Sequence, residues 1–175
     1  MTPEPPVRED GRPSDHMHAQ PALSSANAIE RMHHVGIQVA DLDRSLAFYQ
    51  GLLGFELVTR QVRDEAYVGE VTGYPGVSLE IAHLRPPGGA VMIELTEYHG
   101  VPRTPVDTST ANPGTAHTCY VVDDVDTVHT ALLAAGVRPV SRNVVEPDAG
   151  IALGGKVVYV QDPDGVRVEL LQPPP

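Results

Sequence analysis

The sequence has few cysteines, few basic residues and no long apolar runs, and each shortage excludes a class of protein. It contains one cysteine, Cys119, among 175 residues, which excludes an internal disulfide framework and any cysteine-based zinc site. Lys and Arg together number 12 against 23 Asp and Glu, and they form no cluster. Because nucleic-acid backbones are bound by basic surfaces, we expect no nucleic-acid partner for a chain with a formal net charge of −11.

Long apolar runs are also missing. No stretch approaches the roughly 20 apolar residues that a helix needs to cross a bilayer, so we expect no membrane partner. The chain starts with MTPEPP, which lacks the basic start and following apolar run of a signal peptide. We therefore expect a soluble, cytoplasmic protein.

The first 28 residues differ in composition from the rest of the chain. They are rich in Pro, charge and small polar residues and hold few large apolar side chains. Burial cannot offset the entropy lost on ordering such a segment, so we expect residues 1–28 to be a disordered tail. Residues 29–175 are long enough to form a single domain with its own core.

What the chain does contain is an internal repeat. The stretch HVGIQVADLD, which begins at His34, is matched at a constant offset by HTCYVVDDVD, which begins at His117. The ends of the halves also match, because VMIEL around Glu94 corresponds to VRVEL around Glu169. Each half therefore opens with a histidine in a strand and closes with a glutamate in a strand.

Apolar periodicity and turn residues predict the elements of the first half. We expect strands over residues 34–40, 55–62, 77–84 and 90–96, with an irregular segment over 64–75. A helix is expected to follow the first strand and to run to about Leu53. Asp41 or Asp43 is its predicted N-cap, and Gly54 is its predicted left-handed C-cap.

The second half repeats this order. We expect strands over residues 116–122, 138–142, 155–161 and 166–171, and a helix over 125–135 that ends at Gly136. A long loop separates the second and third of these strands. The sequence thus predicts an α+β fold of two paired βαβββ modules, at about 31–98 and 115–172, with a linker over 99–114. The modules are expected to form an incomplete barrel around a metal site.

The repeated histidines and glutamates are candidate metal ligands. Side chains alternate between the faces of a strand, so His34, Glu94, His117 and Glu169 can point into one concave space if the halves curl into a barrel. Imidazole nitrogens and carboxylate oxygens suit Zn, Ni, Co, Fe or Mn. Four protein ligands in an octahedral shell leave two positions for water or substrate, as a catalytic metal requires.

Each of these residues has a simpler interpretation when taken alone. A single histidine is more often a hydrogen-bonded structural residue than a ligand. A strand glutamate between apolar neighbours, as both are here, more often faces solvent. The metal site is favoured because equivalent positions in both halves carry the same chemistry.

With these motifs, the chain resembles the vicinal oxygen chelate superfamily over about residues 31–172. That group includes glyoxalase I, methylmalonyl-CoA epimerase, extradiol dioxygenases, fosfomycin resistance enzymes and bleomycin-binding proteins. The motifs that carry the resemblance are HVGIQVADL from residue 34, AFY to LGF over 47–55, and DPDG to EL over 162–170. The chain looks closest to bacterial glyoxalase I around IELT at 93–96 and YVQDPDG at 159–165.

The resemblance implies that His34, Glu94, His117 and Glu169 bind a divalent metal ion, and that the protein is commonly a homodimer. It implies a glyoxalase I-like lyase or isomerase that moves a proton next to a carbonyl through a metal-bound enediolate. The substrate is a small molecule that chelates the metal. Glu169, or Glu94 for the opposite face, is the implied catalytic base.

The chain departs from glyoxalase I at two places. Glyoxalase I binds glutathione partly through an arginine four residues after the first histidine and an asparagine four residues after the first glutamate. Gln38 and Tyr98 stand at these places here. We predict that the substrate-binding residues are Gln38, Tyr98, Cys119 and Arg167.

Two other functions fit the same resemblance. One is Fe(II)-dependent ring cleavage of a catechol-like compound, as in extradiol dioxygenases. The other is a non-catalytic protein that binds a drug or metabolite between the modules, as in bleomycin resistance. Such binders usually lack the metal ligands, so the full set of four favours an enzyme.

Overall fold

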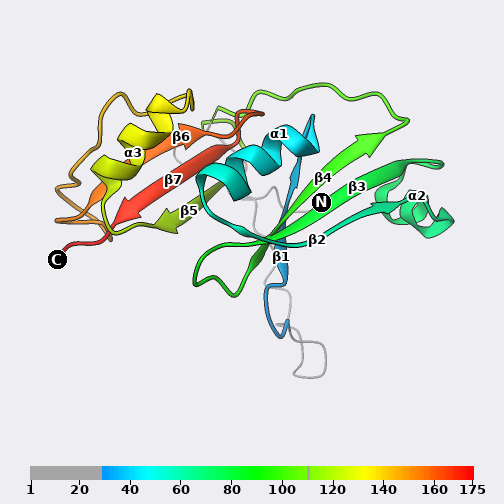
Figure 1. The fold of residues 1–175 in the computed structure, drawn as a ribbon, viewed down its shortest axis with the longest axis horizontal. Helices are drawn as coiled ribbons and strands as arrows, with labels where there is room; N and C mark the ends of the chain where they lie inside the picture. The colour runs from blue at the N-terminus through cyan, green and yellow to red at the C-terminus, as the bar shows by residue number, and fades with distance from the viewer. Residues whose placement is uncertain (1–28, 110) are drawn as a thin grey trace, which may run out of the picture. The chain divides into compact units, whose positions relative to one another are not determined.

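The computed structural model describes residues 29–109 and 111–175. The tail predicted over residues 1–28 lies outside the described residues. The compact unit from His33 to Pro175 has an α+β architecture with two separate sheets, one in each half of the chain (Figure 1). The described strands form no closed barrel.

The first sheet has four strands in the order β1-β4-β3-β2. Its strands are β1 (His34–Gln38), β2 (Glu56–Arg63), β3 (Ser78–Arg85) and β4 (Met92–His99). β1 runs parallel to β4, and the other neighbours are antiparallel. These are the four strands that apolar alternation predicts, and their ends are shifted by a few residues.

The second sheet has three strands in the order β5-β7-β6. They are β5 (His117–Val121), β6 (Lys156–Gln161) and β7 (Arg167–Gln172). The strand predicted over residues 138–142 is wrong, because only Pro139 forms a bridge there, to Val160. Proline has no N–H to give to a ladder. The next two amides, of Val140 and Ser141, both donate to the Tyr159 carbonyl, so no regular pairing continues.

A helix follows the first strand of each module, as predicted. α1 (Leu42–Leu46) is capped by Asp41, whose carboxylate accepts from the Arg44 amide, and α3 (Val125–Ala134) is capped in the same way by Asp124. The first helix continues as a π-helix, η2 (Ala47–Leu52), instead of a regular α-helix. The predicted stops are confirmed, because Gly54 and Gly136 have φ of 72° and 84°.

The segment 64–75, predicted to be irregular, contains the helix α2 (Ala66–Thr72). Gly69, which looks like a helix breaker, lies inside it. A Cβ at this position would lie 3.1 Å from the Tyr74 carbonyl oxygen and from the Pro75 Cα, so close packing against this backbone favours glycine here. Gly73 then ends the helix in the left-handed region.

Both modules contribute to one hydrophobic core. Ile93 and Leu95 of β4 and Val168 and Leu170 of β7 are buried in it. Because side chains alternate along a strand, the opposite face of each sheet is left open to ligands. That face carries the partly exposed glutamates predicted to bind metal. Within the described ranges, no helix has both the length and the apolar character that crossing a membrane demands.

Candidate metal centre

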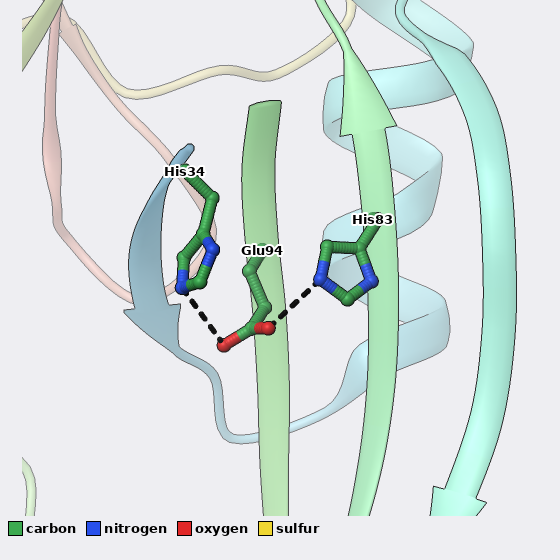
Figure 2. A group of neighbouring side chains, drawn as sticks. All are labelled: His34, His83 and Glu94. Atoms are coloured by element: carbon green, nitrogen blue, oxygen red, sulfur yellow. Dashed lines mark ion pairs between the residues drawn. The ribbon is translucent and has the colours of Figure 1, made fainter. Parts of the chain in front are cut away.

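The first module places three possible metal ligands together on neighbouring strands. Glu94 of β4 lies opposite His83 of β3 in the antiparallel register. Its two oxygens lie 3.7 Å from His34 Nε2 and 2.9 Å from His83 Nε2. Figure 2 shows the two imidazoles on either side of this carboxylate. The predicted pair of His34 and Glu94 is therefore close in space, and a second histidine joins it.

The second module places a similar group on its own sheet. His117 Nε2 lies 3.1 Å from Glu169 Oε2. The Tyr159 hydroxyl donates to the same oxygen at 2.8 Å and lies 3.3 Å from His117 Nε2. Burial, followed by the hydrogen bond to Glu169, raises the pKa of Tyr159 to about 12. Tyr159 is therefore a neutral hydrogen-bond donor at physiological pH.

The repeat extends to this third position. His83 pairs with Glu94 in the antiparallel ladder of the first sheet, and Tyr159 pairs with Glu169 in the equivalent ladder of the second. His83 is not among the ligands predicted from the sequence. The available signal was a histidine between Ala82 and Leu84, two residues that are fully buried, in a strand predicted to alternate.

One chain brings the four predicted ligands together as two pairs, one on each sheet. Among the described residues, two groups of three or more ligand-type side chains have donor atoms within 4.8 Å of one another, and neither contains both pairs. The first is His34, His83 and Glu94. The set of four remains a prediction for this reason.

The other group consists of Glu80, Glu97 and His99. Its carboxylates already have protein partners, because Glu80 pairs with Arg60 at 2.7 Å and Glu97 accepts from the Leu42 amide at 2.8 Å. Arg103 also lies 3.5 Å from Glu97. This group is an ion-pair network that anchors the start of α1.

The chemistry of the first group fits a transition-metal ion. Two imidazoles and one carboxylate supply nitrogen and oxygen donors of the kind that Zn, Ni, Co, Fe and Mn accept. Each histidine presents Nε2 to Glu94 while its Nδ1 contacts another group, His33 Nδ1 at 2.8 Å and Thr59 Oγ1 at 3.2 Å. Such contacts behind a metal-binding histidine orient its ring.

Two of the predicted substrate-binding residues, Gln38 and Tyr98, line one large cavity. Its volume is about 830 Å³, and its wall also includes His117 and the linker around Arg103. Tyr98 stacks edge-on against Tyr74, with ring centroids 6.1 Å apart. This cavity has the size of a small-molecule site.

The other two, Cys119 and Arg167, lie beside the second pair of candidate ligands. Cys119 is opposite Glu169 in the parallel register, and Arg167 is opposite His117. Burial and the neighbouring Glu169 raise the pKa of the Cys119 thiol to about 11. The buried Nε of Arg167 has no hydrogen-bond partner in the described part of the chain. Both residues therefore lie beside the second His–Glu pair, and the raised pKa makes the Cys119 thiol a poor nucleophile at neutral pH.

A model of the Glyoxalase/Bleomycin resistance protein/Dioxygenase superfamily matches residues 31–170. The chain belongs to this superfamily. The resemblance stated from the sequence is thereby confirmed, and the α+β fold agrees with it. Residues 31–170 include both sheets up to the middle of β7, and hence both His–Glu pairs.

Relatives within the glyoxalase superfamily include proteins named as lactoylglutathione lyases. One of Vibrio parahaemolyticus, named "Probable lactoylglutathione lyase", is 34% identical over 145 residues, which cover 81% of this chain and 90% of that one. One of Arabidopsis thaliana, named "Probable lactoylglutathione lyase, chloroplastic", is 34% identical over 149 residues. This chain covers 37% of the Arabidopsis protein. These similarities support a glyoxalase I-like enzyme.

The fold is also found in solved structures. A glyoxalase family protein from Bacillus cereus aligns with a TM-score of 0.74 and 24% identity, covering 87% of this chain and 100% of that one. At this identity the similarity establishes the fold alone. The activity must therefore be argued from the residues.

Proposed function

We propose that this glyoxalase-superfamily chain is a divalent-metal-dependent enzyme of the glyoxalase I type. It would catalyse proton transfer next to a carbonyl in a small molecule with two neighbouring oxygens. The observation that carries the proposal is the equivalence of two His–Glu pairs, one on the open face of each sheet, with separations of 3.7 and 3.1 Å. His34, Glu94, His117 and Glu169 would hold the ion.

We propose further that a homodimer brings the two kinds of pair together. In one chain the pairs lie on separate sheets, and both histidines lie on edge strands, β1 and β5. Edge strands expose unpaired backbone groups and are natural places for association. His34, Gly36 and Gln38 of β1 are exposed, as are His117, Cys119 and Val121 of β5. A second copy could contribute its pair at these edges.

The bound cation would stabilise the negative charge that develops on the substrate oxygens as the adjacent carbon loses its proton. Glu169 would accept that proton and return it to the neighbouring carbon or to the same carbon. The Tyr159 hydroxyl, which donates to Glu169 at 2.8 Å, would hold the carboxylate in position. Glu94 would serve the opposite face of the substrate in the same way, with His83 beside it.

The first substrate to test is the hemithioacetal of glutathione and a 2-oxoaldehyde, because the relatives are named lactoylglutathione lyases. Gln38 has no positive charge with which to bind a glutathione carboxylate. The same 2-oxoaldehyde should therefore be offered with an uncharged thiol and as the free 2-hydroxycarbonyl compound.

The test begins with metal analysis of purified protein, followed by removal of the ion with a chelator and re-addition of Zn, Ni, Co, Mn or Fe(II). We expect proton exchange with heavy water that is lost on chelation and restored by a metal. Glu94→Gln and Glu169→Gln should lower the exchange rate at least about a hundredfold, the lower end of the range for acid–base groups. The proposal fails if the protein holds no ion and neither variant changes the exchange rate.

One observation favours a second reaction. His34, His83 and Glu94 form a set of two histidines and one carboxylate, which is the donor set of many non-haem Fe(II) oxygenases. Ring cleavage of a catechol-like compound would require Fe(II) and consume oxygen. Activity that is unchanged in air-free buffer eliminates it. Tight ligand binding that is indifferent to chelator would instead indicate a binding protein.

A further inference from the structure

We infer that His83 is a metal ligand, and that His34, His83 and Glu94 of the first module hold a divalent transition-metal ion without help from His117 and Glu169. This inference rests on the proposed metal dependence. It adds a fifth residue to the predicted set and divides that set unequally, with three ligands on the first sheet and two on the second.

The first argument is the separation of the donor atoms. Ligands about 2.1 Å from an ion lie roughly 3 Å apart when adjacent in an octahedral shell and roughly 3.4 Å apart in a tetrahedral one. The separations here are 2.9 Å between His83 Nε2 and Glu94 Oε2 and 3.7 Å between His34 Nε2 and Glu94 Oε1. These two separations, each to a different Glu94 oxygen, bracket the expected values, and the donor atoms of all three residues lie within 4.8 Å of one another.

The second argument is the orientation of the two imidazoles. Both turn Nε2 toward Glu94, as Figure 2 shows. The His83 Nδ1 contacts the Thr59 hydroxyl at 3.2 Å. If Nδ1–H donates to that hydroxyl, the lone pair of Nε2 faces the Glu94 carboxylate, and the two repel each other. A cation bound by both groups removes this repulsion. If the proton is on Nε2 instead, His83 only donates a hydrogen bond to Glu94. The experiment must distinguish these two cases.

The third argument comes from the second module, which has a tyrosine at the equivalent position. The Tyr159 hydroxyl donates to Glu169 and is therefore occupied as a donor. A neutral phenol is a poor ligand for these ions, whereas a neutral imidazole is among the commonest. The His83 side chain is also less exposed than His117, the histidine of the second module, at 16% against 44%. The first module thus has, in His83, a stronger metal ligand that is also better shielded from solvent.

The experiment uses the full chain and measures Zn²⁺ and Co²⁺ bound per chain, with dissociation constants from equilibrium dialysis. The starting protein is the double variant His117→Ala/Glu169→Ala, which removes the second pair. We expect it to retain about one ion per chain. Adding His83→Phe should weaken Zn²⁺ binding at least about tenfold, the lower bound found even for residues behind a ligand. Adding Tyr159→Phe instead is the matched control and should leave the Zn²⁺ dissociation constant of the double variant unchanged.

A further variant, His83→Gln, separates the two roles of His83. Its amide can donate to Glu94 but cannot replace an imidazole as a ligand. We expect it to bind Zn²⁺ as weakly as His83→Phe and to alter the visible absorption spectrum of bound Co²⁺, which reports the donor atoms. Full retention of affinity and spectrum in His83→Gln would overturn the inference. Circular dichroism of each variant confirms that it is folded.

The outcomes also separate this inference from the proposed function. If the wild-type chain binds no ion, both are wrong. If the wild-type chain binds an ion and the double variant binds none, the inference is wrong and the proposed function stands.

Discussion

Tyr49 donates a buried hydrogen bond to Asp162, with 3.0 Å between the hydroxyl oxygen and carboxylate Oδ2. Tyr49 belongs to η2 of the first module, and Asp162 begins the turn between β6 and β7 of the second. The other oxygen of Asp162 accepts from the amides of Asp164 and Val166. One carboxylate therefore connects the modules and shapes the turn that leads into the strand of Glu169.

Tyr49→Phe should destabilise the fold. It removes the hydroxyl and leaves one oxygen of a buried carboxylate without its partner, which costs about 1–3 kcal/mol of unfolding free energy. Urea unfolding followed by circular dichroism measures this value. Tyr98→Phe is a suitable control, because Tyr98 is only partly buried and its aromatic contact within the described part of the chain is the edge-on packing against Tyr74. Equal stability of Tyr49→Phe and wild type would contradict the prediction.

Asp162 should make the stability depend on pH. Burial raises the pKa of its carboxyl above the usual value, more than its hydrogen bonds lower it. The folded state therefore binds this proton more tightly than the unfolded state. The resulting stabilisation is complete below the unfolded pKa of about 3.9 and is lost as pH rises through the higher folded pKa.

The comparison that isolates this effect is metal-free wild type against Asp162→Asn, unfolded in urea between about pH 4 and pH 8. The difference in unfolding free energy, wild type minus variant, should be most positive in acid and should fall as pH rises. Asparagine keeps an oxygen for the two turn amides. A difference that is constant or rises with pH would contradict the assignment.

Cys119 should react slowly with thiol reagents even though it is exposed. Burial of the thiol and the charge of Glu169 raise its pKa from 9.0 to about 11. The thiolate is the reactive form, so alkylation of metal-free protein at about pH 8 should be roughly a hundredfold slower than that of a free thiol. As the chain has one cysteine, the measurement needs no other substitution.

Glu169→Gln provides the matched variant for this thiol. It removes the charge that raises the pKa of Cys119 and should therefore speed alkylation, while Glu94→Gln should not. Acceleration by both variants would show that general loosening, and not the local charge, controls the rate.

Gln38→Arg tests the link to glutathione. Gln38 lines the cavity beside Tyr98, and an arginine there would supply a charge-assisted contact to a substrate carboxylate. We expect kcat/KM for the glutathione hemithioacetal to rise about tenfold or more, mainly through KM, since such contacts are worth about 1.5–3 kcal/mol. The hemithioacetal of an uncharged thiol is the control and should gain nothing. An equal gain for both thiols would refute carboxylate recognition.

From the sequence alone we could predict the repeat, the two helices with their glycine C-caps, seven of the eight strands expected and the residues of the two His–Glu pairs. These features depend on short-range chemistry. Asp41 needs only the Arg44 amide three residues away to cap a helix, and Gly54 needs only its own freedom at positive φ. Alternation within a strand places Glu94 on the face opposite Leu95 without knowledge of the partner strand.

Which side chains join the pairs, and which segments pack together, became clear from the three-dimensional structure. His83 lies against Glu94 because β3 and β4 pair in one register among several that their sequences allow. Gly69 lies inside a helix, at a position where the Tyr74–Pro75 backbone leaves little space for a Cβ. The strand predicted near Pro139 is lost because two successive amides share one carbonyl. Register and shared acceptors are set by contacts between strands, and the packing at Gly69 depends on the path of the chain at Tyr74–Pro75, so no local pattern of residue types records them.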